Sequence, residues 1–416
     1  MNVIQNQFIE ILSSGIRGSG ISLDNKDNIN WSEIFKLAKA HKVEGIIYST
    51  LNKSGLTSYI DEGELKDIKL NTFNVGIKQL KHIRNLSHIF TKIIDSNIKI
   101  IVLKGLVVRE FYPNPEQRSM SDADILVKCE DIERVKALLI NNDYRLLEDH
   151  EASHHMAFYN NNGSMIELHW NLFKRDGFTS KLEEYEKKIW EDTIEVKVGE
   201  ASVLSLGYED LALHLCMHMA AHLAATGFGV RQLCDLVLLV EKEGKSIDWN
   251  KFIEKSKIYK FEKFNAVIFK VCNILFNMEI PYQIDTSKVD SKAYIEAIIS
   301  EIFESGVHGK SDMTNQFGHQ IAFNFNGKDE NATLGAFKRF IRFLFPRIED
   351  MSEKYSYAKK VKILTPIAWI HHIFAGVFTK GYTVNDKFKF VTKGARVAIK
   401  RNQLLEWMEL GVKEKI

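Results

Sequence analysis

The sequence predicts an α+β fold in which a small mixed or antiparallel sheet is flanked by N-terminal and C-terminal helical regions. Apolar residues recur about every 3.6 positions over residues 1–96, which is typical of amphipathic helices. Residues 97–206 instead contain short β-branched or alternating runs bounded by turn residues, as strands do. Helical spacing returns over residues 207–416. We therefore predict three domains with these boundaries, in keeping with a chain of 416 residues.

The composition is that of an ordinary globular protein, with 45% hydrophobic and 26% charged residues. A formal net charge of +2 gives no global bias toward nucleic acid or a membrane surface. Four cysteines without metal-ligand spacing indicate reduced thiols, and the N-terminal residues lack the pattern of a secretory signal, so we expect a cytoplasmic protein. The longest apolar run, residues 363–378, is short and is interrupted by Pro366, so we expect a core helix and no transmembrane segment.

The two helical regions differ in the chemistry they offer. The N-terminal segments 31–51 and 64–97 predict helices that pack on their neighbours and carry no obvious reactive group. The C-terminal region begins with strongly helical segments at 208–224 and 231–244. Arg231 and Asp235 are four residues apart, so we expect them to pair on one helix. A stripe of histidines, more typical of hydrogen-bonded structural residues than of a metal site, comprises His214, His218 and His222.

The middle region predicts strands joined by turns and short helices. The NNNG run at 160–163 favours a hairpin, because Asn and Gly tolerate positive φ. The expected strands fall within 97–105, 123–127, 144–149, both arms of the hairpin within 154–170, 192–198 and 201–206, and the expected helices begin at Leu106 and span 131–143.

Two acids lie at the start of the strand predicted at 123–127, Asp122 just before it and Asp124 within it. Asp122 and Asp124 project to the same face, because side chains two apart in a strand point the same way. Their repulsion and desolvation are costly unless cations such as Mg²⁺ neutralise them. If the strand that contains Glu167 pairs nearby, three carboxylates converge. Three acids that hold two metals about 4 Å apart form the clamp used in phosphoryl and nucleotidyl transfer.

The surroundings of these acids favour a phosphate-binding site. Lys104 and Gly105 end the first strand at a sharp turn, where backbone amides at a helix start can approach an anion. Arg118 can contact phosphate through paired N–H groups. His169 follows Glu167 by two positions and so lies on the same strand face.

Together these motifs resemble the bacterial family of uncharacterised nucleotidyltransferases in the DNA polymerase beta-like nucleotidyltransferase superfamily. The resemblance rests on LKG at 103–105, YP at 112–113, Arg118, DAD at 122–124 and IELHW at 166–170. Residues 37–51 and 211–240 are similar to that family's flanking helical blocks.

The resemblance implies transfer of a nucleoside monophosphate from an NTP, ATP by default, to an unidentified acceptor with release of pyrophosphate. A small molecule or peptide is favoured over nucleic acid as the acceptor. The implied catalytic and metal-binding residues are Asp122, Asp124 and Glu167 with two Mg²⁺ ions (Mn²⁺ as an alternative), and the implied nucleotide-binding residues are Lys104, Gly105, Arg118 and His169.

One departure from the superfamily pattern leaves other functions open. Leu106 stands where a serine usually follows the glycine, and Lys104 or Arg118 could replace the missing hydroxyl. A degenerate, non-catalytic nucleotide-binding or scaffold protein is one alternative. Another is a toxin-like transferase acting on tRNA or protein, which would use the basic segment 380–401. A solvated basic face is the commoner explanation of that segment.

Overall fold

The computed structural model divides the chain into two compact units. Residues 1–219 and 229–291 form the first unit, and residues 220–228 and 292–416 form the second. Every predicted site residue lies in the first unit, while the predicted three-domain division stays a prediction. The structure describes residues 1–24, 26–149, 155–172, 188–306, 345–377 and 400–410.

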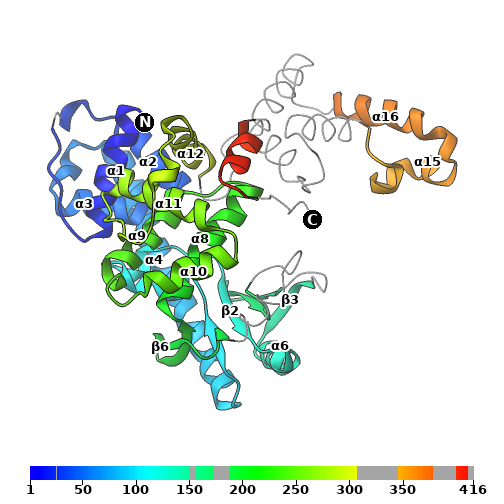
Figure 1. The fold of residues 1–416 in the computed structure, drawn as a ribbon, viewed down its shortest axis with the longest axis horizontal. Coiled ribbons are helices and arrows are strands. Elements are labelled where there is room, and N and C mark those ends of the chain that lie inside the picture. The colour runs from blue at the N-terminus through cyan, green and yellow to red at the C-terminus, as the bar shows by residue number, and fades with distance from the viewer. Residues whose placement is uncertain (25, 150–154, 173–187, 307–344, 378–399, 411–416) are drawn as a thin grey trace. The chain divides into compact units, whose positions relative to one another are not determined.

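Helices form the N-terminal region and most of the described residues after the sheet, as predicted (Figure 1). The first helix begins at a capping box, in which the side chains of Asn2 and Gln5 each bond the other residue's backbone N–H. It buries one apolar stripe, including Phe8 and Leu12. The α-helices are α1 (Val3–Ile16), α2 (Trp31–Ala40), α3 (Glu44–Lys53), α4 (Glu62–Asp95), α5 (Gly105–Val108), α6 (Ile132–Asn141), α8 (Tyr208–Ala225), α9 (Val230–Glu243), α10 (Trp249–Ile258), α11 (Glu262–Phe276), α12 (Lys292–Ser305), α15 (Ser356–Lys360) and α16 (Thr365–Val377).

A seven-stranded mixed sheet forms the centre of the first unit, in the order β3-β4-β5-β2-β1-β7-β6. The pairs β2–β5 and β1–β7 are parallel, and the other four pairs are antiparallel. The predicted α+β class with a mixed sheet is confirmed. The strands are β1 (Ile100–Val102), β2 (Ala123–Val127), β3 (Tyr144–Asp149), β4 (His155–Asn160), β5 (Met165–His169), β6 (Thr193–Val198) and β7 (Ala201–Leu206).

The sheet is held by helices and by a tight hairpin. Helix α4 packs on the β6–β7 end of the sheet, and α6 packs on β3 (Figure 1). The predicted hairpin joins β4 to β5, where Gly163 has φ +81° and the side chain of Asn160 accepts a bond from Ser164 N. Strand β2 is buried along its whole length, so its single acid, Asp124, lies inside the protein.

Two buried histidines link α2 and α4 to other parts of the first unit. His41 Nδ1 accepts a hydrogen bond of 3.2 Å from Val230 N, and His82 Nδ1 lies 2.8 Å from Ser164 Oγ. Burial lowers the pKa of His41 to about 4. The pKa of His82 is also lowered to about 4, first by burial and then by Arg109. Both imidazoles are therefore neutral in the folded protein at pH 7.

We expect these histidines to make the protein less stable as the pH falls from 7 to 5. Because their folded pKa lies below the unfolded value of about 6.5, the unfolded chain binds more protons across this window. Each should remove about 2 kcal/mol by pH 5. Urea unfolding at both values measures the loss. His82→Gln should reduce the pH dependence, and an equal slope in the wild type and this variant would contradict the expectation.

The second unit changes two expectations. Helix α16 contributes Ala368 to a buried cluster with Tyr355, yet Ile367 and Ile370 are 55% and 56% exposed, so the predicted core helix is buried on one side only. In the described parts of the chain, no helix is long and apolar enough to cross a membrane. Most of the basic segment 380–401 lies outside the described residues. Its last member, Arg401, is buried against Glu301 instead of facing solvent.

Candidate functional site

The structure brings the three predicted acids together at the centre of the sheet. Asp124 on β2 lies directly opposite Glu167 on the parallel strand β5, and Asp122 immediately precedes β2. The pairing that the site required is therefore present. The Asp124 side chain is 10% exposed, whereas the Glu167 side chain is 22% exposed, so the cluster is buried at Asp124 and reaches solvent at Glu167.

The electrostatics of the cluster are those of a site that attracts cations. Burial raises the pKa of Asp122, and the carboxylates of Asp124 and Glu167 raise it further. Burial also disfavours the charged form of Asp124, but Lys104 and a hydrogen bond from His169 hold its pKa well below the usual range. The repulsion predicted from the sequence is thus visible at Asp122, while Asp124 already has cationic partners.

Lys104 supplies one of those partners from the turn that follows β1. Its Nζ lies 3.1 Å from Asp124 Oδ1, and its backbone has φ +46°, a conformation that side-chain-bearing residues rarely adopt. Such strain persists where the surrounding structure fixes it, often at functional sites. The turn therefore holds the ammonium group against the acids.

Gly105 has a packing role at this turn. A Cβ atom on Gly105 would lie 2.4 Å from Arg118 Nη1 and 2.8 Å from Met120 Sδ. The glycine thus lets the Arg118 guanidinium come against the backbone. Its predicted approach to a phosphate stays a prediction.

Arg118 belongs to a buried network with residues of other elements. Its Nε and Nη2 donate to the two carboxylate oxygens of Asp235 at 3.2 and 2.6 Å, and Tyr112 Oη donates to the same carboxylate at 2.7 Å. The predicted pairing of Arg231 with Asp235 is therefore wrong, because α9 packs against α5 and the 109–111 turn and so presents Asp235 to Arg118. Arg231 donates to Ser119 O instead.

Histidines approach the acids from two elements. His169 Nε2 on β5 lies 3.0 Å from Asp124 Oδ1 and 3.5 Å from Glu167 Oε2. Burial acts to lower the pKa of His169, but its hydrogen bonds to these carboxylates raise it above the usual value. From the histidine stripe on α8, His218 lies near enough to help lower the pKa of Asp124, after the stronger effects of burial, Lys104 and His169. Helix α8 therefore borders the site.

Sequence patterns did not show that Arg231 and His218 lie beside the acids, or that Asp235 binds Arg118. Burial and the other two acids raise the pKa of Asp122, and Arg231 is close enough to lower it in part. These residues lie more than 90 positions after Asp122, and their positions in the fold depend on how α8 and α9 pack. The histidine stripe was the one visible signal, and it did not indicate which member faces the acids.

The residues present fit a divalent cation. One ligand atom each from Asp124, Glu167 and His169 lies within 4.8 Å of the others, and among the described residues this is the one such group of His, Cys, Asp or Glu. Carboxylate oxygens are preferred ligands of hard divalent ions, and Asp122 adds a further carboxylate beside the group.

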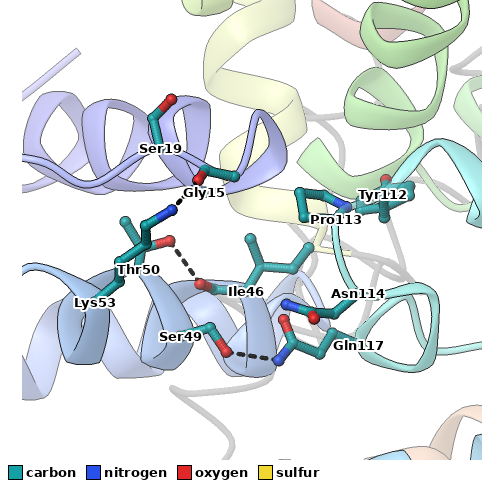
Figure 2. Close-up of a pocket in the computed structure, with 11 residues that line it drawn as sticks. Gly15, Ser19, Ile46, Ser49, Thr50, Lys53, Tyr112, Pro113, Asn114 and Gln117 are labelled. Carbon is teal, nitrogen blue, oxygen red and sulfur yellow. Dashed lines mark hydrogen bonds between the residues drawn. The ribbon is translucent and has the colours of Figure 1, made fainter.

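A separate cavity of about 280 Å³ lies where the end of α1 and α3 meet the loop at 112–117 (Figure 2). Its lining combines polar and apolar groups, and Gln117 donates to Ser49 Oγ at 2.6 Å. Tyr112 also lines it, so the cavity adjoins the Arg118–Asp235 network. None of the three acids lines this cavity.

A mixed sheet that presents carboxylates from two adjacent strands beside a lysine defines a site suited to metal-bound phosphates. The chain belongs to the family of uncharacterised nucleotidyltransferases, which matches residues 27–277 and so includes the whole sheet and site. No curated protein matches the chain. The family assignment supports a nucleotidyl-transfer role with a nucleoside triphosphate as substrate, and it confirms the resemblance at this level.

Proposed function

We propose that this protein is a metal-dependent nucleotidyltransferase of the DNA polymerase beta-like superfamily. It would move a nucleoside monophosphate from an NTP, ATP by default, to an acceptor hydroxyl. The observation that carries the proposal is the opposition of Asp124 and Glu167 on parallel central strands, with Asp122 beside them. The reduced thiols of all four cysteines support a cytoplasmic location.

The acids would act as ligands and as a proton acceptor. Asp122, Asp124 and Glu167 would hold two Mg²⁺ ions, which when bound neutralise the triphosphate charge. The side chain of Glu167 is 22% exposed, so an acceptor can reach it, and Glu167 would take the proton from the attacking hydroxyl. The acceptor oxygen would bond to the α-phosphorus. The bond between the α-phosphorus and the oxygen that bridges it to the β-phosphate would break, which releases pyrophosphate.

Phosphate contacts would come mainly from Lys104. Leu106, in the usual serine position, is 2% exposed and offers no hydroxyl. In Arg118, Nε and Nη2 bind Asp235, so Nη1, which packs beside Gly105, is the atom left for a phosphate. Lys104 is 15% exposed in its side chain and bears its ammonium next to Asp124, where a metal-bound triphosphate would sit.

The alternatives have less support. A scaffold has no need of three clustered acids, in which burial and then the other two carboxylates raise the pKa of Asp122. A transferase acting on tRNA would use the basic segment 380–401, of which Arg401 is buried against Glu301. We favour a small-molecule or peptide acceptor.

The test is calorimetric titration of the full-length protein with ATP in Mg²⁺ and in EDTA, followed by an assay of pyrophosphate release with pooled candidate acceptors. A nucleotidyltransferase requires Mg²⁺ for tight ATP binding and releases pyrophosphate with at least one acceptor pool. ATP binding that is unaffected by EDTA would refute the proposed metal site and favour a nucleotide-binding scaffold.

A further inference from the structure

The acid cluster contains a nitrogen atom in a position where a metal ligand is expected. His169 Nε2 lies 3.0 Å from one carboxylate oxygen and 3.5 Å from another. Neighbouring ligands about 2.1 Å from an octahedral ion are about 3 Å apart. The spacing of the imidazole nitrogen from Asp124 and Glu167 is therefore close to that of adjacent ligands on one ion.

The fold fixes the ring in this position. His169 ends β5 two residues after Glu167 and lies in register with Leu126, so it shares a sheet face with both acids. The side chain of His169 is 8% exposed, and the ring of His155 lies 5.1 Å away on the neighbouring strand β4. A buried ring packed in this way keeps its nitrogen directed at the carboxylates without a large loss of side-chain freedom on metal binding.

We propose that His169 binds the metal directly through Nε2, so that the centre prefers Mn²⁺ to Mg²⁺. This inference rests on the proposed function and changes the identity of its cofactor. Mg²⁺ binds oxygen ligands and accepts nitrogen poorly, whereas imidazole is a common ligand of transition-metal ions. A donor set of carboxylates and one imidazole therefore favours the transition metal.

A competing role for His169 is to orient Asp124 through a hydrogen bond while oxygen atoms alone bind the ion. The variant His169→Gln separates the two roles, because its amide can donate a hydrogen bond to Asp124 but has no imidazole nitrogen. His155→Gln is the matched control, since it removes the neighbouring imidazole on β4.

The experiment is pulsed electron paramagnetic resonance of Mn²⁺ bound to full-length protein with ¹⁵N-labelled histidine, with Mg²⁺ competition measured on the same samples. We expect ¹⁵N coupling in the wild type and in His155→Gln, its loss in His169→Gln, and a fall of about tenfold or more in the preference for Mn²⁺ over Mg²⁺ in that variant. The wild-type spectrum is informative even if a variant folds poorly.

The other outcomes overturn different statements. Bound Mn²⁺ that requires Asp124 but shows no ¹⁵N coupling, or coupling that persists in His169→Gln, would refute the role of His169 and leave the proposed function standing. Mn²⁺ binding that is unchanged in Asp124→Asn would show that the acids are not the metal site, and would refute the proposed function together with this inference.

Discussion

Asp124→Asn is expected to lower kcat/KM for nucleotidyl transfer by a factor on the order of 10³ or more, while the protein stays folded. Asp124 is the acid at which the other groups meet, because Lys104 and His169 both lie within hydrogen-bonding distance of its Oδ1. Asparagine keeps the shape of the side chain but removes the charge that a divalent ion requires. Electrostatic stabilisation by a bound metal contributes several kcal/mol to such reactions, and each 1.36 kcal/mol corresponds to about a factor of ten.

The same substitution should abolish the Mg²⁺ dependence of ATP binding, which calorimetry measures without turnover. Glu130→Gln is the matched control, because Glu130 is an exposed acid a few residues after β2 and should leave both quantities unchanged. Thermal unfolding of the three proteins checks that the fold is intact. Full activity in Asp124→Asn would remove the basis of the proposed mechanism.

Local sequence patterns were sufficient to predict the strands that carry the acids. The apolar run at 123–127 and the hairpin signal at 160–163 correspond to β2 and to the β4–β5 turn. The sequence predicted that Asp124 and Glu167 come together only if their strands pair. That pairing joins residues 43 positions apart, which local patterns do not reveal. Strand β1 is shorter at both ends than the run that predicted it, because it begins only at Ile100 and Lys104 adopts the strained turn after it.

Tertiary packing decided the features that the sequence did not predict. An i, i+4 spacing gives Arg231 and Asp235 the opportunity to pair, but a buried carboxylate binds the partner that reaches it with the best geometry. Arg118 reaches both carboxylate oxygens of Asp235, which lies 117 positions later in the chain. The exposed side of α16 was missed for a similar reason, because an apolar run does not indicate how much neighbouring structure covers it.

The Tyr112 and Arg118 motif therefore supports the site through packing. Tyr112 and Arg118 both bind Asp235, and Arg118 in turn fills the space beside Gly105. Gly105 follows Lys104, whose ammonium group binds Asp124. The network thus connects α9 to the turn that positions the lysine, and a change at Asp235 should reach the acids through the 104–105 turn.

Asp235→Asn is expected to reduce the free energy of unfolding by about 3–5 kcal/mol, because it leaves the buried Arg118 guanidinium without a carboxylate. Asp235 is 2% exposed and Arg118 is 7% exposed, so water cannot replace the lost partner. Urea denaturation measures the change. The double variant Arg118→Met/Asp235→Leu should recover much of the loss, since two apolar side chains leave no buried charge.

The surface variant Glu133→Gln provides the comparison for that buried pair. Glu133 lies 3.5 Å from Lys136 with 76% of its side chain exposed, and an exposed pair contributes about 0–1 kcal/mol. If Asp235→Asn costs no more than Glu133→Gln, the Arg118–Asp235 pair does not stabilise the fold. A large loss in Asp235→Asn that the double variant does not recover would instead assign the stability to the hydrogen bond from Tyr112, which both Asp235 variants weaken.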